Sequence, residues 1–177
     1  QTLADVTTRD LTQLQATFAQ LVAAVLVLNG DTCTCFAAAL AAYYEKIPVG
    51  HVEAGLRTSD RYSPFPEEMY RRLTDQLSDI YFAAPSRARH NLLGDGCDIG
   101  SIFVTGNPVV DALYTVMERS PGLEKTELHW VNAIEGRICL LTAHRRESLG
   151  VPLTRVFLAI KELVQTFHDL NVIFPVH

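Results

Sequence analysis

The 177-residue chain has few cysteines, and it lacks the spacing that a zinc site needs. Its four thiols are Cys33, Cys35, Cys97 and Cys139. Four are too few for a disulfide-stabilised scaffold, and no CxxC pair is present. Cys33 and Cys35 are separated by one residue at a predicted helix start, so their side chains cannot face each other. The pattern favours structural thiols in a reduced, cytoplasmic compartment, and it predicts no metal site.

Long hydrophobic runs are also missing. The longest apolar run, Leu21–Leu28, is far shorter than the roughly 20 residues that span a bilayer. No signal-peptide pattern stands at the start. The net charge of −5 argues against a broad surface for nucleic acid or anionic lipid. We therefore expect neither a nucleic-acid partner nor a membrane partner.

What the sequence does contain is an alternation of apolar runs and helical patterns. Short apolar runs predict strands, and apolar residues three or four apart predict helices. The predicted strands are 22–28, 47–52, 80–84, 102–105, 138–142 and 172–176. The predicted helices are 3–20, 32–45, 86–93, 109–119 and 153–167, with a further helix that begins at Pro66. Such alternation predicts the α/β class with parallel sheets.

Two of these elements carry a further expectation. Val22–Leu28 is apolar throughout, which is typical of a parallel strand covered on both faces. In the helix after Pro66, the spacing of Met69, Leu73 and Leu77 predicts one apolar face.

The polar stretch 120–136 contains Pro121, Gly122 and Gly136 and interrupts the alternation. We therefore predict a first domain over 1–119, a linker over 120–136 and the start of a second domain over 137–177. The last predicted strand ends without a crossover helix, so we expect both domains to be incomplete.

The stretch Gly50–Arg72 is the candidate active site. It combines a predicted strand, a loop rich in ionisable groups and a helix start, and the carboxyl ends of strands in α/β sheets are where ligands bind. Glu53 is either solvated at the loop edge or held in a cleft as a general base. Glu67 and Glu68 either take part in catalysis or only stabilise the helix start, where carboxylates favour the positive end of the helix dipole and can pair with arginines one turn later. Arg57 is either a surface charge or an anion clamp.

Two other predicted strand ends carry polar groups. Asp31 either caps the helix that follows it or points into the cleft while Thr32 or Thr34 caps. His144 and Arg145 follow a predicted strand and precede a predicted helix. They either form a binding site for an anion or phosphate or are only a solvated basic turn. His177 ends a strand, where a lone histidine is more often structural.

Seven segments of this chain resemble motifs of one enzyme family. The chain is similar to the non-hydrolysing UDP-N-acetylglucosamine 2-epimerases over essentially its whole length, with the motifs in the family's order. The segments are GDT (30–32), PVGHVEAGLRT (48–58), YSPFPEE (62–68), RLTD (72–75), VTGN (104–107), HRRES (144–148) and PVH (175–177).

The resemblance implies a glycosyltransferase-B-like fold of two Rossmann-type domains. It implies an isomerase that interconverts UDP-N-acetylglucosamine and UDP-N-acetylmannosamine by eliminating UDP to leave 2-acetamidoglucal and adding it back. It implies no metal or redox cofactor, and a homodimer for the full-length protein. The matching catalytic positions are Asp31, Glu53, Glu67 and His144, and the matching substrate-binding positions are Arg71, Arg145 and His177.

The chain departs from the family at several places. Cys33 and Cys35 replace threonines, Tyr70 replaces an asparagine and Ala143 replaces a glycine. The family's first strand with its diphosphate-binding loop, and much of its second domain, have no counterpart here. We therefore expect the 177 residues alone to epimerise poorly. Two alternatives stay open: a hydrolysing relative that releases UDP and N-acetylmannosamine, and a non-catalytic protein that binds a nucleotide sugar.

Overall fold

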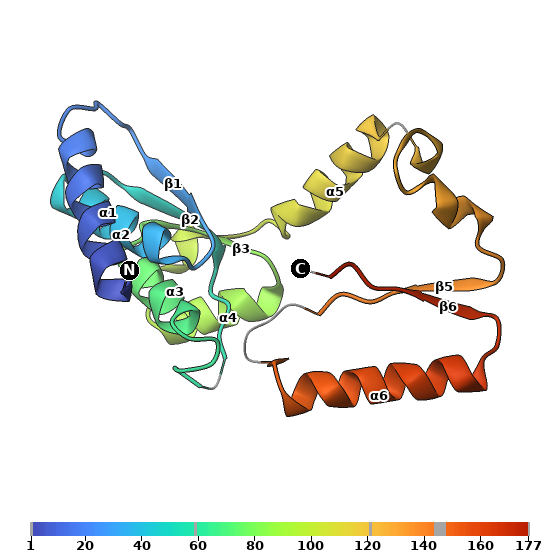
Figure 1. Cartoon of the computed structure of the whole chain (residues 1–177). Helices are drawn as coiled ribbons and strands as arrows, with labels where there is room; N and C mark the ends of the chain where they lie inside the picture. Colours follow the sequence, from blue (N-terminus) through green and yellow to red (C-terminus); the bar gives the residue numbers. More distant parts are fainter. Residues whose placement is uncertain (1, 59, 121, 144–147, 177) are drawn as a thin grey trace. The chain divides into compact units, whose positions relative to one another are not determined.

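The computed structural model describes residues 2–58, 60–120, 122–143 and 148–176. Its residues divide into two compact units, Gln1–Leu113 and Tyr114–His177, each with its own parallel sheet (Figure 1). The α/β class with parallel sheets is therefore confirmed. The division between the units falls inside helix α5 (Pro108–Arg119), and the predicted domain boundary at residue 119 coincides with the end of that helix.

The first unit contains a four-stranded sheet in the order β1-β2-β3-β4. Its strands are β1 (Leu26–Asn29), β2 (Val49–Ala54), β3 (Ile80–Ala83) and β4 (Ile102–Val104). Its helices are α1 (Leu3–Phe18), α2 (Cys33–Tyr44), α3 (Glu67–Gln76), α4 (Ser86–Gly94) and the short η1 (Ile99–Ser101), followed by α5. Because consecutive strands are neighbours and run parallel, their carboxyl ends meet at one edge.

The second unit contains a parallel pair, β5 (Arg137–Leu140) and β6 (Leu170–Ile173), joined through α6 (Val151–Thr166). The predicted linker holds two short 3₁₀ helices, η2 (Leu123–Lys125) and η3 (His129–Ala133). No helix among the described residues is both long enough and apolar enough to cross a bilayer.

The prediction for Val22–Leu28 was wrong in two respects. The strand begins only at Leu26, and Val22 is fully exposed. Only one face of β1 is covered among the described residues, because Leu28 is buried while Val27 is 58% exposed. A continuous apolar run does not show whether both faces of a strand are covered, because the elements that cover them are remote in the chain.

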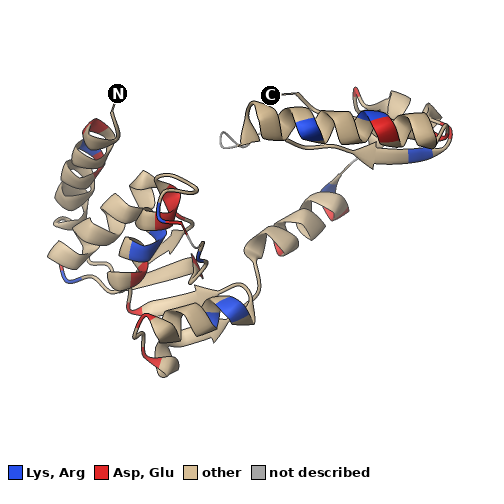
Figure 2. Ribbon diagram, turned by 90° about the horizontal axis from the view of Figure 1, so that it is seen from below, with Lys and Arg blue, Asp and Glu red and all other residues tan. Residues whose placement is uncertain are grey.

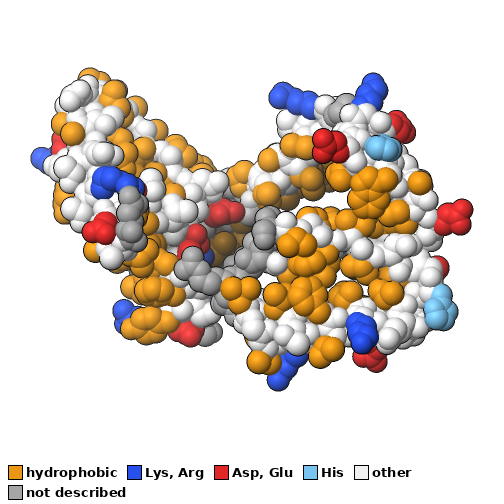
Figure 3. All heavy atoms as spheres, viewed as in Figure 1, with side chains coloured by type: hydrophobic (Ala, Val, Ile, Leu, Met, Phe, Trp, Pro, Cys, Tyr) orange, Lys and Arg blue, Asp and Glu red, His pale blue; other side chains and the backbone are white. Residues whose placement is uncertain are grey.

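Charged and apolar side chains are distributed differently in the two units. Acidic and basic residues lie side by side within the first unit (Figure 2). Hydrophobic side chains gather on the viewed face of the second unit (Figure 3). Ile138 and Leu140 of that unit are both exposed. The first unit brings charged side chains together in buried ion pairs such as Arg57–Asp75, whereas the Arg137–Asp169 pair of the second unit is exposed.

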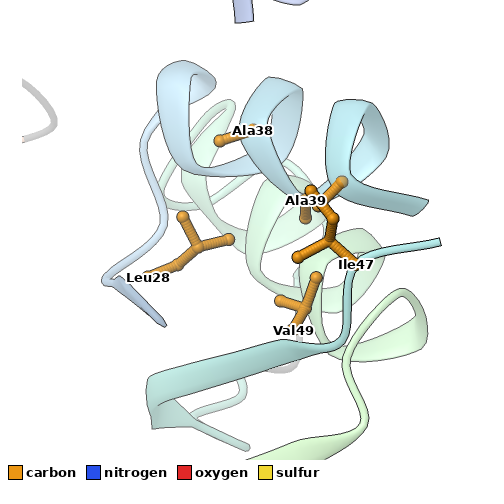
Figure 4. Close-up of a cluster of buried hydrophobic side chains, with 6 residues drawn as sticks. Leu28, Ala38, Ala39, Ile47 and Val49 are labelled. Carbon is orange, nitrogen blue, oxygen red and sulfur yellow. The ribbon is translucent and has the colours of Figure 1, made fainter. Parts of the chain in front are cut away.

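The core of the first unit lies where α2 packs on β1 and β2. Five alanines of α2 are buried, and small side chains let a helix approach a sheet closely. Leu28, Ile47 and Val49 fill the space beneath two of these alanines (Figure 4). A second cluster lies between α4 and the strands β3 and β4, with Leu92 at its centre and fully buried. These two clusters hold the strand ends that carry the candidate site.

Candidate active site

Glu53 lies at the carboxyl end of β2 in an unusual backbone conformation. Its φ is +69°, a value that side-chain-bearing residues seldom adopt, and the pairing of β2 with β3 shifts register around it. Its carboxylate accepts a hydrogen bond from Nδ2 of Asn107, 2.7 Å away, in the loop between β4 and α5. Non-glycine residues in such conformations gather at functional sites, since the surrounding structure must support them.

Asp31 follows the end of β1, directly after Gly30, which lies near the carboxylate of Glu53. Gly30 has a φ of +86°, and a methyl group added there would lie 3.9 Å from Oε2 of Glu53. Of the two alternatives for Asp31, the cap was wrong: Thr32 caps α2 by accepting from the backbone N–H of Cys35. The Asp31 carboxylate is thereby free to accept from Nη2 of Arg71.

Glu68 is the second residue of α3 and is completely buried. Its carboxylate accepts from Nη1 of Arg71 at 2.9 Å, from Nε of Arg72 at 2.8 Å and from the N–H of Thr58 at 3.1 Å. The expectation that Glu68 pairs with arginines one turn later is confirmed. The side chain of its neighbour Glu67 forms no hydrogen bond or ion pair with any residue that the structure describes, and its charge acts on Tyr70.

Arg71 joins three parts of the site. Besides Asp31 and Glu68, its guanidinium donates to the carbonyl of Leu56 at 3.2 Å, and the residue is only 8% exposed. The site thus contains a chain of two negatively and two positively charged side chains, namely Asp31, Glu68, Arg71 and Arg72. Pairing of this kind is what makes burial of a charge tolerable.

Arg57 is neither a surface charge nor a free anion clamp. Its Nη2 lies 2.7 Å from Oδ2 of Asp75 and 2.7 Å from Oδ2 of Asp95. Burial alone would lower the pKa of Arg57, but the charges of Asp75 and Asp95 and their hydrogen bonds outweigh it and raise that pKa. Arg57 therefore stays charged and serves an internal ion pair.

Tyr70 packs against α2. Its ring stacks on Phe36 with centroids 5.5 Å apart and an interplanar angle of 11°. Burial and a hydrogen bond with Cys33 raise the pKa of Tyr70, while a hydrogen bond with Thr7 acts in the opposite direction. Tyr70 and Cys33, two of the positions expected to depart from the motifs, thus interact with each other.

Two residues of this site received no role from the sequence, namely His51 and Asp75. His51 and Asp75 are both completely buried, and their side chains are 2.6 Å apart. A signal was present in α3, where Glu68, Arg71, Thr74 and Asp75 recur at helical spacing and define a polar face.

The other candidate residues lie outside the described residues. They are His144, Arg145 and His177. Among the residues that the structure describes, no group of three histidine, cysteine or acidic side chains is arranged to hold a metal ion. A pocket of about 350 Å³ opens beside Lys46 and Pro48, before β2 begins and hence at the opposite end of that strand from Glu53.

Comparison with known proteins gives one consistent result. The sequence profile of the family described as UDP-N-acetylglucosamine 2-epimerase matches residues 1–177. A Bacillus subtilis UDP-N-acetylglucosamine 2-epimerase is 46% identical over 177 residues, which are 100% of this chain and 46% of that protein. The chain thus spans about half the length of the curated relatives it matches.

Two solved structures resemble the chain closely. The UDP-GlcNAc 2-epimerase of Neisseria meningitidis bound to UDP-GlcNAc is 38% identical with a TM-score of 0.88, and the match covers 100% of this chain and 49% of that one. The S. aureus MnaA structure with UDP is also 38% identical with a TM-score of 0.88, and 47% of its chain is covered. The glycosyltransferase-B-like fold class expected from the sequence is therefore confirmed, with about half of that fold represented.

Proposed function

Because the chain belongs to the UDP-N-acetylglucosamine 2-epimerase family, we propose that its protein interconverts UDP-N-acetylglucosamine and UDP-N-acetylmannosamine. The observation that best supports this is the placement of Asp31 and Glu53 at the carboxyl ends of the adjacent parallel strands β1 and β2, in segments that carry the family motifs. Relatives of this fold bind UDP-GlcNAc or UDP, which supports a nucleotide sugar as the substrate here.

The proposed reaction begins with removal of the proton on C2 of the sugar. The C1–O bond to the diphosphate breaks, a C1=C2 double bond forms, and 2-acetamidoglucal and UDP are held together. UDP then adds back to C1 while a proton returns to C2 on the opposite face. Removal and return from opposite faces require two acid–base groups in different positions.

The three acidic side chains have different partners, which suits them to the separate steps of proton removal and proton return. Glu53 accepts a hydrogen bond from a neutral amide, and Asp31 is bound by an arginine. The side chain of Glu67 forms no hydrogen bond or ion pair with a described residue. We assign the proton transfers to these three groups. Arg71 is occupied by Asp31 and Glu68, so its influence on substrate runs through the Asp31 carboxylate.

We assign the departing diphosphate to the basic residues that follow β5 in the sequence. His144 would aid the leaving group, and Arg145 and His177 would bind substrate, because developing negative charge needs positive partners. We also propose that the full-length protein is a homodimer located in the cytoplasm. Sedimentation velocity of the full chain would test whether it is a dimer.

The test of the proposed function is proton NMR of UDP-N-acetylglucosamine incubated with the full-length protein in D₂O. We expect the C2 proton signal to disappear while UDP-N-acetylmannosamine forms. Free N-acetylmannosamine with UDP would instead identify the hydrolysing reaction. Binding of the nucleotide sugar by a folded protein without exchange of the C2 proton would identify a non-catalytic binder and overturn the proposal.

A further inference from the structure

His51 on β2 is completely buried, and both of its ring nitrogens are hydrogen-bonded. Nδ1 lies 2.6 Å from Oδ1 of Asp75, and Nε2 lies 2.8 Å from the carbonyl oxygen of Gly30. His51 thus bridges helix α3 to the loop that presents Asp31. The proposed reaction gives it no part.

The proton on Nε2 follows from its partner. A backbone carbonyl only accepts hydrogen bonds, so Nε2 must donate to Gly30. In a neutral histidine the other nitrogen, Nδ1, would then present a lone pair to Asp75.

The partners of Asp75 decide the proton on Nδ1. Oδ2 of Asp75 accepts from Nη2 of Arg57 at 2.7 Å and from the N–H of Gly55 at 3.2 Å. A carboxylate facing an arginine is stabilised in its ionised form, in which Oδ1 can only accept. Nδ1 of His51 therefore donates as well, and the ring carries both protons.

The surrounding charges agree with this assignment. Asp75 faces His51 from α3, and Arg57 and Asp95 continue the ion-pair chain from the loops after β2 and α4. With a protonated His51, this chain holds two positive and two negative charges. With a neutral His51, the single positive charge of Arg57 would be shared between Asp75, which is fully buried, and Asp95, whose side chain is 37% exposed, so the buried carboxylate would be only partly compensated.

The remaining ionisable groups nearby are already partnered or neutral. Tyr81 on β3 is an un-ionised phenol whose hydroxyl donates to the carbonyl of Ser78 at 2.6 Å. Asp31, next to Gly30, is bound by Arg71, and Glu53 is bound by Asn107. None of these groups removes the need for a second proton on His51.

We propose that His51 is a positioning residue: a buried, doubly protonated imidazole that links Asp75 to the Gly30 carbonyl and so sets Asp31 relative to Glu53. Gly30 has a φ of +86° and directly precedes Asp31, so a charged donor on its carbonyl fixes the turn that presents the carboxylate. The consequence for turnover rests on the proposed function, whereas the protonation state does not.

The first test is NMR of the full-length protein labelled with ¹⁵N in its histidines, recorded at neutral pH. Long-range proton–nitrogen correlations distinguish a ring with two N–H groups from a neutral ring with one bare nitrogen. We expect His51 to show two protonated nitrogens, with its signals assigned by their loss in His51→Asn and compared with those of exposed His90, assigned by their loss in His90→Gln. A bare nitrogen on His51 would overturn the proposal. This readout needs no substrate.

The second test compares His51→Gln with His51→Asn. The amide nitrogen of glutamine reaches about as far as Nε2 and can still donate to Gly30, while that of asparagine reaches only as far as Nδ1. We expect kcat to fall about 10²-fold in His51→Asn with little change in KM, and to be partly restored in His51→Gln. Equal losses in both folded variants, or a change in KM alone, would contradict positioning through Gly30. Absence of turnover in the unsubstituted protein would count against the proposed function and leave the NMR result standing.

Discussion

At the scale of single residues, Glu53 carries the strongest sign of function. A positive φ on a residue with a side chain costs about 1–3 kcal/mol and persists only where the surroundings enforce it. Here the bulge in β2 and the hydrogen bond from Asn107 hold the carboxylate beside Gly30. Stability alone gives no reason to keep such a residue at a strand end.

Replacing Glu53 by glutamine removes the charge and keeps the size. We expect Glu53→Gln to lower kcat by about 10²–10⁴-fold, the usual contribution of a general acid or base. The fold is expected to remain, because the amide oxygen can still accept from Asn107. Steady-state epimerisation and circular dichroism would measure the two effects. Exposed Glu118→Gln on α5 is the matched control, and a folded Glu53→Gln protein with full activity would remove Glu53 from the mechanism.

Tyr81 predicts a pH dependence of stability. Burial, and then contact with Cys97, raises the pKa of its phenol in the folded protein above the ordinary tyrosine value of about 10. A raised folded pKa stabilises the folded state below the unfolded pKa, and this stability is lost as pH rises through the folded pKa.

The measurement is urea unfolding at a series of alkaline pH values. Stability should fall less steeply with pH in Tyr81→Phe than in the unsubstituted protein, because the variant has no phenol to ionise at this position. Tyr114→Phe, at an exposed tyrosine, should keep the original slope. Identical slopes in all three proteins would show that Tyr81 is not the group responsible.

At the scale of secondary-structure elements, α3 buries the face that sequence patterning assigns to solvent. The spacing of Met69, Leu73 and Leu77 predicts one apolar face, and Leu77 packs against the core of the first unit. Leu73 on that face is nevertheless 39% exposed, while Glu68 and Asp75 are fully buried. The polar face is buried because partners from other elements, among them Asp31, His51 and Arg57, neutralise it.

Removing Glu68 tests this account of α3. Glu68→Ala leaves Arg71 without one of its two anions in a buried position, and breaking one partner of a buried pair costs about 3–5 kcal/mol. Gln76→Ala, on the exposed side of the same helix, should change stability by less than about 0.5 kcal/mol. Denaturant unfolding would measure both variants, and a cost for Glu68→Ala as small as that of the control would mean that the network does not stabilise the fold.

At the scale of the whole molecule, the contacts divide into two compact units with separate sheets. Each sheet is covered by helices of its own unit: α2 and α4 pack on the first, and α6 contacts β6 in the second. We therefore expect damage to the core of one unit to leave the hydrogen bonds of the other intact.

Leu92→Ala tests that expectation. Leu92 is fully buried between α4 and the sheet, and truncating such a leucine costs about 2–5 kcal/mol. Hydrogen exchange followed by mass spectrometry should show faster exchange in β2, β3 and β4, with unchanged protection in β5, α6 and β6. Equal acceleration throughout the chain would show that the two units unfold as one.

The secondary structure and the family of this protein follow from its sequence alone. The alternation of apolar runs with helical spacing predicted every described strand and α-helix to within a few residues, because both periodicities are local properties of the chain. The motifs around Asp31, Glu53 and Glu67 located the candidate site and the family, since the residue types are visible without any structure.

Tertiary structure decided which of those residues meet. Arg71 and Asp31 are 40 residues apart in sequence, and His51 and Asp75 are 24 apart, so no local pattern pairs them. The same reason explains why Val22–Val25 is not part of β1 and why α3 buries charge: coverage and neutralisation come from remote elements. The sequence shows which chemical groups the candidate site contains. Only the packing of β1, β2 and α3 determines which of these groups bind each other and which remain available for chemistry.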